Sequence, residues 1–256
     1  QWLGIDPQRL TVSVYLDDDE AAGIWQQDVG LSADRIERMG EHDNFWPAGA
    51  PSQGPDGVCG PCSEIFYHDD FGDSVEIWNL VFTQFHRVGD PPDNLRPLPS
   101  KNIDTGMGLE RAAMLLQGVP TIFDTDLVRP VLAAAEGLTG AQFGADERSD
   151  TALRLLADHG RAMTFLISDG VVPSNEGRGY VLRRLVRRAV RHAWALGATD
   201  LVTPALVEAT VSVMGEAYPA IAEARVGITE TAEREEVRFR RTLEGGFALL
   251  EREFDD

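Results

Sequence analysis

The chain has 256 residues, of which 43% are hydrophobic, and a formal net charge of −19. This length suits one large or two ordinary domains, and the acidic balance, taken alone, argues against a polyanionic partner. Two cysteines are too few for a disulfide scaffold, and no apolar run approaches the ~20 residues that a membrane span needs. No signal peptide opens the chain, so the sequence predicts a cytoplasmic protein without a membrane partner.

The first part of the chain predicts an antiparallel sheet. Residues 10–16 alternate apolar and polar side chains, as in a half-buried strand, and residues 17–30 follow as a helix with acids in its first turn. Residues 63–70 and 75–89 are rich in β-branched and aromatic side chains, which favours two further strands. Because only a short polar turn joins these two strands, we expect them to be antiparallel neighbours.

Two segments of this part predict irregular structure. Residues 44–64 are dense in glycine and proline, and a loop of this length between ordered elements is typically functional. Residues 91–102 are expected to be irregular as well. The chain is then expected to turn on Gly106 and Gly108 and to continue as a helix over residues 108–118.

The second part predicts helices. Residues 127–140 and most of residues 150–254 have helical patterns of apolar side chains. Strands followed by helices indicate the α+β fold class. We place the boundary at the segment 137–150, so that residues 1–136 form one domain and residues 137–256 form a second, helical domain.

A basic helix is predicted over residues 177–197. Its arginines from 183 onward fall on one stripe of a helical projection, opposite the apolar side chains, and no acid lies four residues away to pair with them. Asn175 precedes the helix in a polar, glycine-rich loop. Arginines contact phosphates and an asparagine amide can read a base edge, so this region predicts nucleic-acid binding. The alternative is a solvated face whose arginines pair with acids of neighbouring elements.

The segment "IDTGMGLER" (103–111) combines an acid, two glycines and an arginine. It lacks the third glycine of a dinucleotide fingerprint and the lysine of a P-loop. Arg111 falls in the first turn of a helix, where free N–H groups favour an anion, and Asp104 suits an ammonium group. The segment therefore predicts a ligand with a cation at one end and phosphate at the other. The alternative is a strand-to-helix turn with an ordinary Asp104–Arg111 ion pair.

Cys59 and Cys62 have the local spacing of half a zinc site, with His42 or His68 as conceivable partners. No second cysteine pair or histidine pair completes such a site convincingly. We therefore expect no zinc, and we assign no residue of the chain as a metal ligand.

Several longer blocks occur in one order and spacing. They are "DNFW" (43–46), "CGPCSEI" (59–65), "EIWNLVFTQF" (76–85), "IDTGMGLER" (103–111), "FDTDL" (123–127), the segment 157–192 and "RTLEGGFALLE" (241–251). Together they resemble the bacterial-type alanyl-tRNA synthetases, which are class II aminoacyl-tRNA synthetases. The resemblance covers nearly the whole chain. It implies the C-terminal part of a class II catalytic core, built on an antiparallel sheet, followed by a helical domain that recognises tRNA.

The resemblance also implies a reaction and its partners. Alanine and ATP, with Mg²⁺, would give alanyl-adenylate, and the alanyl group would then pass to the 3′ end of tRNA(Ala). Asp104 would hold the amino group of alanine in a pocket lined by Trp46 and Asn79. Gly106 and Gly108 would bring the backbone against the adenylate, and Arg111 would hold the ATP phosphates.

The acceptor stem of tRNA(Ala) would contact the helical domain. Asn175 would read its G·U pair. The surface around that contact would be formed by Arg178, Arg183, Arg184, Arg187, Arg188 and Arg191.

The chain also departs from the family pattern. The first and second class II signatures, the editing domain and a C-terminal acid that works with the asparagine are absent from these 256 residues. We therefore expect a partial enzyme that makes no alanyl-adenylate alone. Two alternatives are a non-catalytic RNA-binding fragment or paralogue and a carboxylate-activating enzyme that uses no tRNA.

Overall fold

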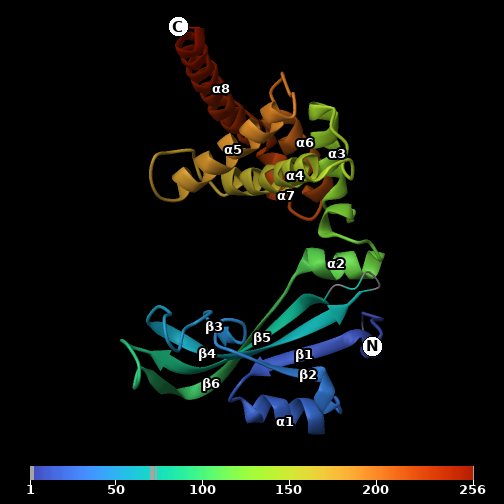
Figure 1. The fold of residues 1–256 in the computed structure, drawn as a ribbon, viewed down its shortest axis with the longest axis vertical. Coiled ribbons are helices and arrows are strands. Elements are labelled where there is room, and N and C mark those ends of the chain that lie inside the picture. The colour runs from blue at the N-terminus through green and yellow to red at the C-terminus, as the bar shows by residue number, and fades with distance from the viewer. Residues whose placement is uncertain (1–2, 70–71, 73, 256) are drawn as a thin grey trace. The chain divides into compact units, whose positions relative to one another are not determined.

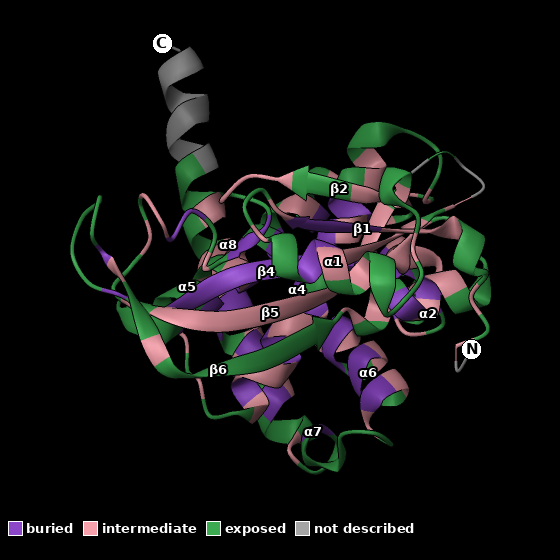
Figure 2. Ribbon diagram, turned by 90° about the horizontal axis from the view of Figure 1, so that it is seen from below, coloured by how far each residue is buried: buried purple, intermediate pink, exposed green. Residues whose placement is uncertain are grey.

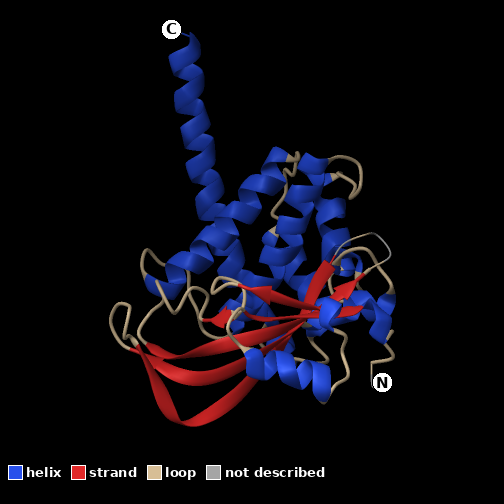
Figure 3. Cartoon of the chain, turned by 60° about the horizontal axis from the view of Figure 1, so that its bottom comes forward, coloured by secondary structure: helices blue, strands red, loops and turns tan. Residues whose placement is uncertain are grey.

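The computed structural model of the chain describes residues 3–69, 72 and 74–255 (Figure 1). The chain divides into two compact units, Gln1–Ile122 and Phe123–Asp256. Every described strand belongs to the first unit, and the described part of the second consists of helices and connecting loops (Figure 3). These two units are called the sheet unit and the helical unit below. The domain boundary predicted between residues 136 and 137 falls inside a helix of the helical unit.

The sheet unit confirms the predicted α+β class. Its strands run in the order β2-β1-β4-β5-β6, with β3 paired to β4. All described pairs are antiparallel except β1 with β2, which the helix α1 connects. The bounds are β1 Leu10–Tyr15, α1 Asp19–Gln27, β2 Ile36–Met39, β3 Phe45–Trp46, β4 Gly57–His68, β5 Ser74–Arg87, β6 Leu95–Met107 and α2 Leu109–Gln117.

Helix α1 covers one face of the sheet. Its start is fixed by Asp18, whose side chain accepts a hydrogen bond from the backbone N–H of Ala21 at 2.9 Å. Ala21 and Ala22 are buried against Val14 of β1, and Phe82 of β5 packs on the same cluster. Because side chains alternate along a strand, the residues next to Val14 and Phe82 point to the opposite face, where the polar groups discussed below gather.

Strand β4 corrects the prediction of a loop over residues 44–64, which is irregular only between β3 and Gly57. Gly60 lies so close to β5 that a Cβ atom would stand 2.0 Å from the carbonyl oxygen of Phe82. The register shifts between Cys59 and Cys62, around Pro61. The glycine and proline that suggest a loop therefore belong to an irregular strand pressed against its neighbour.

Strand β6, which begins at Leu95, corrects the prediction that residues 91–102 are irregular; the prediction is confirmed only for residues 91–94. It is the last strand of the described sheet, and Figure 2 shows it almost wholly exposed. An edge strand tolerates proline because one side of its backbone has no strand to pair with, which accounts for Pro97 and Pro99. Gly106 still belongs to β6, so the chain leaves the sheet only at Gly108, one residue before α2.

The helical unit packs six helices around one apolar core. They are α3 Arg129–Thr139, α4 Glu147–Ser168, α5 Gly177–Ala195, α6 Thr203–Met214, α7 Pro219–Glu223 and α8 Arg225–Asp255, as predicted for this part of the chain. Leu153, Leu182 and Leu206 are fully buried and come from three of these helices. None of the helices in the described ranges has both the length and the apolar character needed to cross a membrane.

Candidate functional sites

Strand register brings three predicted residues of the sheet unit onto one face. Asn79 of β5 lies opposite Gly106 of β6 and opposite Glu64 of β4. Two residues farther along β5, Val81 lies opposite Asp104. Since these positions are two apart, their side chains share the face that α1 does not cover. The sheet therefore places Asn79, Asp104 and Gly106 together, as a binding site requires.

The amide of Asn79 is oriented by Glu64. Its Nδ2 group donates a hydrogen bond to Oε1 of Glu64 at 3.0 Å. Its Oδ1 atom is buried and has no hydrogen-bond partner among the described residues. A buried acceptor without a partner is costly, so this oxygen is suited to a ligand that brings a donor.

Glu64 is a candidate site residue that sequence reasoning missed. Burial, and to a lesser extent the nearby carboxylates of Glu76 and Asp43, raise its pKa to about 7, although Arg111 opposes them. Groups with shifted pKa values cluster at functional sites. The available signal was an acid inside a strand of otherwise apolar character, "EIFY" (64–67).

Arg111 is held at the start of α2 by Glu76. Its Nη1 atom donates to the backbone oxygen of Glu76 at 2.7 Å and pairs with Oε2 of the same residue at 3.0 Å. The turn therefore does not form the Asp104–Arg111 ion pair of the alternative interpretation. Asp104 is exposed, and its Oδ1 accepts the backbone N–H of Thr105 at 2.8 Å.

The loop before β4 is fastened to the same face. Asn44 is buried, and its Nδ2 donates to Oγ of Ser13 at 2.8 Å. Its backbone oxygen accepts the N–H of Cys62 at 2.9 Å. The next residues form β3, where Trp46 lies opposite Gly60 and remains 50% exposed. The predicted pocket residue Trp46 thus stands beside β4 with much of its indole uncovered.

The two cysteines are buried in the sheet unit. Burial raises the pKa of the Cys62 thiol to about 12, and the charge of Glu64 adds to that effect. Burial also raises the pKa of Cys59. Thiolates are the metal ligands and nucleophiles, so these two groups are poorly suited to either role. The part of the chain that the structure describes holds no cluster of three or more potential ligands for a metal.

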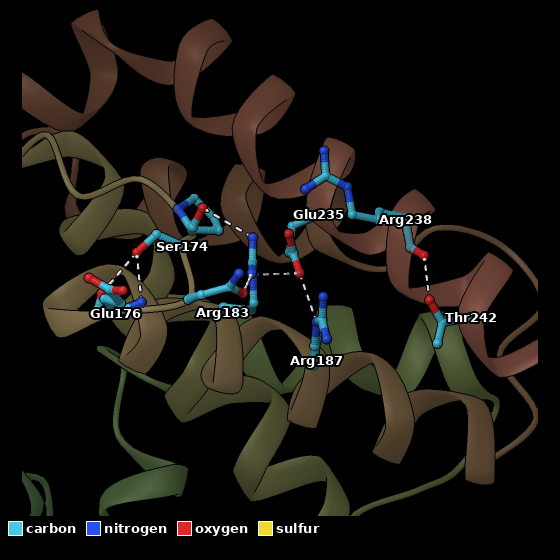
Figure 4. A network of polar contacts seen from close by, with 9 residues as sticks. Ser174, Glu176, Arg183, Arg187, Glu235, Arg238 and Thr242 are labelled. Carbon is cyan, nitrogen blue, oxygen red and sulfur yellow. Dashed lines mark hydrogen bonds and ion pairs between the residues drawn. The ribbon is translucent and has the colours of Figure 1, made fainter.

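In the helical unit, two of the predicted arginines do not belong to an exposed stripe. Arg183 and Arg187 of α5 both reach Oε1 of Glu235 on α8, with Nε–O distances of 3.3 and 2.7 Å (Figure 4). Glu235 is only 3% exposed. The alternative interpretation, pairing with acids of a neighbouring element, is therefore correct for these two residues.

Glu235 was also missed from the sequence. The signal was its position: it follows Ile228 and Ala232 at the spacing of the buried face of a helix, where an acid requires a partner. Its neighbour Glu236 is buried as well, but its carboxylate accepts the backbone N–H groups of Val202 and Thr203 at the start of α6.

The other arginines of α5 are exposed. Arg184, Arg188 and Arg191 line an open hollow of ≈ 540 Å³ together with Arg187 and Phe239. Arg178 is exposed in the first turn of the helix. Several guanidinium groups on one open surface suit a polyanion, even in a chain whose net charge is −19.

Asn175 is held in the loop that precedes α5. Its Oδ1 accepts a hydrogen bond from Nη1 of Arg183, and Nη2 of that arginine donates to the backbone oxygen of Pro173 at 3.3 Å. The loop lies close against the helix at Gly179, where a Cβ would meet Oγ of Ser174 at 2.3 Å. The predicted reader Asn175 and the predicted phosphate ligand Arg183 are thus one hydrogen-bonded pair.

Comparisons with known proteins show the family of the chain. The family model for class II (A) tRNA synthetases matches residues 1–256. An alanine–tRNA ligase of Rhodopirellula baltica is 50% identical over 256 residues, which is 100% of this chain and 27% of that protein. Those of Acidithiobacillus ferridurans and Corynebacterium efficiens are 49% and 48% identical, over 99% and 97% of this chain and 30% and 29% of theirs. The chain thus spans less than a third of these relatives' length.

Proposed function

Since the chain belongs to the class II tRNA synthetase family, we propose that it is the part of an alanine–tRNA ligase that binds alanine, ATP and an acceptor stem. The observation that carries the proposal is the polar face of the sheet unit. There an exposed carboxylate, a buried acceptor oxygen and a glycine backbone share one side, with Arg111 at the adjoining start of α2.

The proposed reaction has two steps. A carboxylate oxygen of alanine attacks the α-phosphorus of ATP, supplied as its magnesium complex, and the bond to the β-phosphate oxygen breaks to release pyrophosphate. A ribose hydroxyl of the tRNA then attacks the carbonyl carbon and AMP leaves. Neither step needs a nucleophile from the protein, so catalysis consists of alignment and charge stabilisation.

The residues of the sheet unit fit this division of work. Asp104 is an exposed carboxylate that can hold the ammonium group of alanine, and the free Oδ1 of Asn79 can accept an N–H of the same ligand. Gly106 carries no side chain on the shared face, so an adenylate can lie against the backbone. Arg111 is fixed by Glu76 through Nη1, which leaves its other N–H groups for phosphate.

The exposed arginines of α5 suit the tRNA backbone. Arg178, Arg184, Arg188 and Arg191 would contact phosphates, and Asn175 would contact the G·U pair of the stem. Arg183 and Arg187 are better described as supports of this surface, because both are tied to Glu235.

Calorimetric titration with alanyl-sulfamoyl adenosine, a stable analogue of alanyl-adenylate, tests the proposal. We expect the chain to bind it more tightly than the bulkier valyl analogue. Asp104→Asn should weaken binding roughly tenfold or more, because the lost hydrogen bond joins two charges. Asp93→Asn, at an exposed acid of the same unit, is the matched control.

Equal affinity for both analogues, or an Asp104→Asn variant that binds like Asp93→Asn, would overturn the alanine site. Binding of RNA alone, without the analogue, would favour the RNA-binding module instead.

A further inference from the structure

Two arginines of α5 converge on one buried carboxylate. Oε1 of Glu235 lies 2.7 Å from Nε of Arg187 and 3.3 Å from Nε of Arg183. The side chain of Arg183 is 13% exposed and that of Arg187 is 34% exposed. A carboxylate this deeply buried needs a cationic partner, so Glu235 holds both guanidinium groups in place. Figure 4 shows Glu235 on α8 with both arginines reaching it from α5.

Arg183 extends this arrangement to the loop before the helix. Its Nε group lies 3.3 Å from Oε1 of Glu235 as an ion pair without a hydrogen bond, whereas its terminal nitrogens donate to Oδ1 of Asn175 and to the backbone oxygen of Pro173. The planar guanidinium thereby joins a buried acid of α8 to an exposed amide far earlier in the chain. Both of its ends have fixed partners, so its orientation is determined by packing rather than by solvent.

This contact determines how the amide of Asn175 is turned. A guanidinium group has donors and no acceptor, so only the oxygen of the amide can face it. The Nδ2 group of Asn175 must then point away from Arg183. The residue consequently offers two N–H donors outward, and in the minor groove of a base pair these suit acceptor atoms of the bases.

We propose that Arg183 and Glu235 are positioning residues for acceptor-stem recognition: Glu235 anchors Arg183, and Arg183 turns the amide of Asn175 so that Nδ2 faces the RNA. The inference rests on the proposed role of Asn175 as a reader. It separates two functions within one row of arginines, because Arg183 sets specificity while Arg184, Arg188 and Arg191 supply affinity for phosphate.

Arg187 provides a matched control. It binds the same oxygen of Glu235 but makes no contact with Asn175 among those that the structure describes. Arg187→Lys removes the hydrogen bond of Nε to Glu235 at 2.7 Å, and Arg183→Lys removes an ion-pair contact of Nε at 3.3 Å. Both variants keep the charge. Only Arg183→Lys removes the fork that reaches Glu235 and Asn175 at once.

The test measures the affinity of the chain for two RNA hairpins that copy an acceptor stem and differ only in a G·U or a G·C pair. We expect the wild-type chain to prefer the G·U hairpin. Arg183→Lys and Glu235→Gln should lower that preference roughly tenfold or to none, which is the scale of one base contact. Arg187→Lys should weaken the binding of both hairpins equally and keep the preference for the G·U hairpin.

A second measurement needs no RNA. The side-chain amide signals of Asn175 in a ¹⁵N spectrum of the free chain should shift in Arg183→Lys and stay in place in Arg187→Lys. A wild-type preference that survives in Arg183→Lys, with unshifted amide signals, overturns the positioning role and leaves the proposed function standing. A wild-type chain without preference overturns the reading role of Asn175 and the inference with it.

Discussion

The sheet unit and the helical unit each hold an asparagine beside a charged side chain. The two asparagines differ in which atom of the amide is bonded to that neighbour. In the sheet unit Glu64 accepts from Nδ2 of Asn79, which leaves Oδ1 free. In the helical unit Arg183 lies between Glu235 and Asn175, and its guanidinium donates a hydrogen bond to Oδ1 of Asn175. The sign of the adjacent charge thus decides whether an amide offers an acceptor or a donor.

The difference matches the two proposed ligands. The ammonium group of an amino acid needs acceptors, and Asn79 is bonded to the carboxylate of Glu64, which has Glu76 and Asp43 nearby. An RNA duplex needs cations for its phosphates and donors for its base acceptors, and the helix that follows Asn175 carries exposed arginines. In a chain of net charge −19, the proposed RNA site therefore depends on a local cluster of arginines on α5.

The largest expected effect comes from adding a side chain at Gly60, where β4 packs closely on β5. Gly60→Ala puts a Cβ atom 2.0 Å from the carbonyl oxygen of Phe82, so the strand must move. We expect a loss of roughly 3 kcal/mol or more in the unfolding free energy of the sheet unit, and loss of analogue binding. Chemical denaturation, monitored through signals from each unit separately, measures the loss of unfolding free energy.

The control for this variant lies in the helical unit. Gly137 is in α3, and a Cβ atom added there would meet no other group within 4 Å, so Gly137→Ala should stabilise by about 0.5–1 kcal/mol. A Gly60→Ala chain with wild-type stability would contradict the close packing of β4 on β5.

The next effect concerns the helical unit alone. Reversing the charges of Arg184 and Arg188 to glutamate should weaken hairpin binding by roughly thirtyfold, about 2 kcal/mol, and lower the salt slope by about 2. Fluorescence anisotropy at several salt concentrations measures both quantities. The same reversal at Arg38 and Arg96, exposed residues of the sheet unit, should have far less effect. Equal losses in the two double variants would contradict a specific surface on α5.

Exchanging each asparagine for aspartate tests the contrast directly. Asn79→Asp places a second carboxylate against Glu64 and removes the donor, so we expect a loss of about 1.5 kcal/mol at pH 8. Asn175→Asp gives Arg183 a charged acceptor at an exposed site, so the change should stay within about 0.5 kcal/mol. Urea denaturation of the two variants gives both changes in unfolding free energy. Similar losses at the two positions would mean that the neighbouring charges do not differ as described.

A further effect is the pH dependence caused by Glu64. Its pKa of about 7 in the folded chain exceeds its ordinary value of 4.5, so the folded state binds more protons than the unfolded state between those limits. Stability therefore falls as pH rises from about 4.5 to about 7. Glu64→Gln keeps an acceptor for Asn79 and removes this decline, so its advantage over wild type should grow across that window.

Denaturant midpoints at pH 4.5, 6 and 8 measure the difference. Glu37→Gln, at an exposed acid of β2, should follow wild type at every pH. A Glu64→Gln curve parallel to wild type would show that this carboxyl titrates normally.

Local patterns predict part of the molecule well. The acids and apolar spacing that predict α1, and the amphipathic pattern that predicts α5, are properties of single segments. Strand β6 and the first half of β4 escaped prediction because their glycines and prolines are acceptable only at a sheet edge or in an irregular strand. Those settings depend on which strands lie alongside.

The candidate sites show the same limit. The chemistry of Asp104, Arg111 and Asn175 indicated ligand contacts, but their specific roles came from family resemblance and stay proposals. Glu64 and Glu235 were missed because their partners come from other elements: strand register brings Glu64 to Asn79, and the packing of α8 on α5 brings Glu235 to Arg187, 48 residues away. A helical projection of α5 cannot show that one side of its arginine row is covered.

The most direct test follows both asparagine side chains at once in ¹⁵N spectra of the chain. Addition of alanyl-sulfamoyl adenosine should shift the amide signals of Asn79 and leave those of Asn175 in place. Addition of the G·U hairpin should do the reverse. Signals of both residues that move together with either ligand, or that move with neither, would contradict the assignment of one asparagine to each ligand.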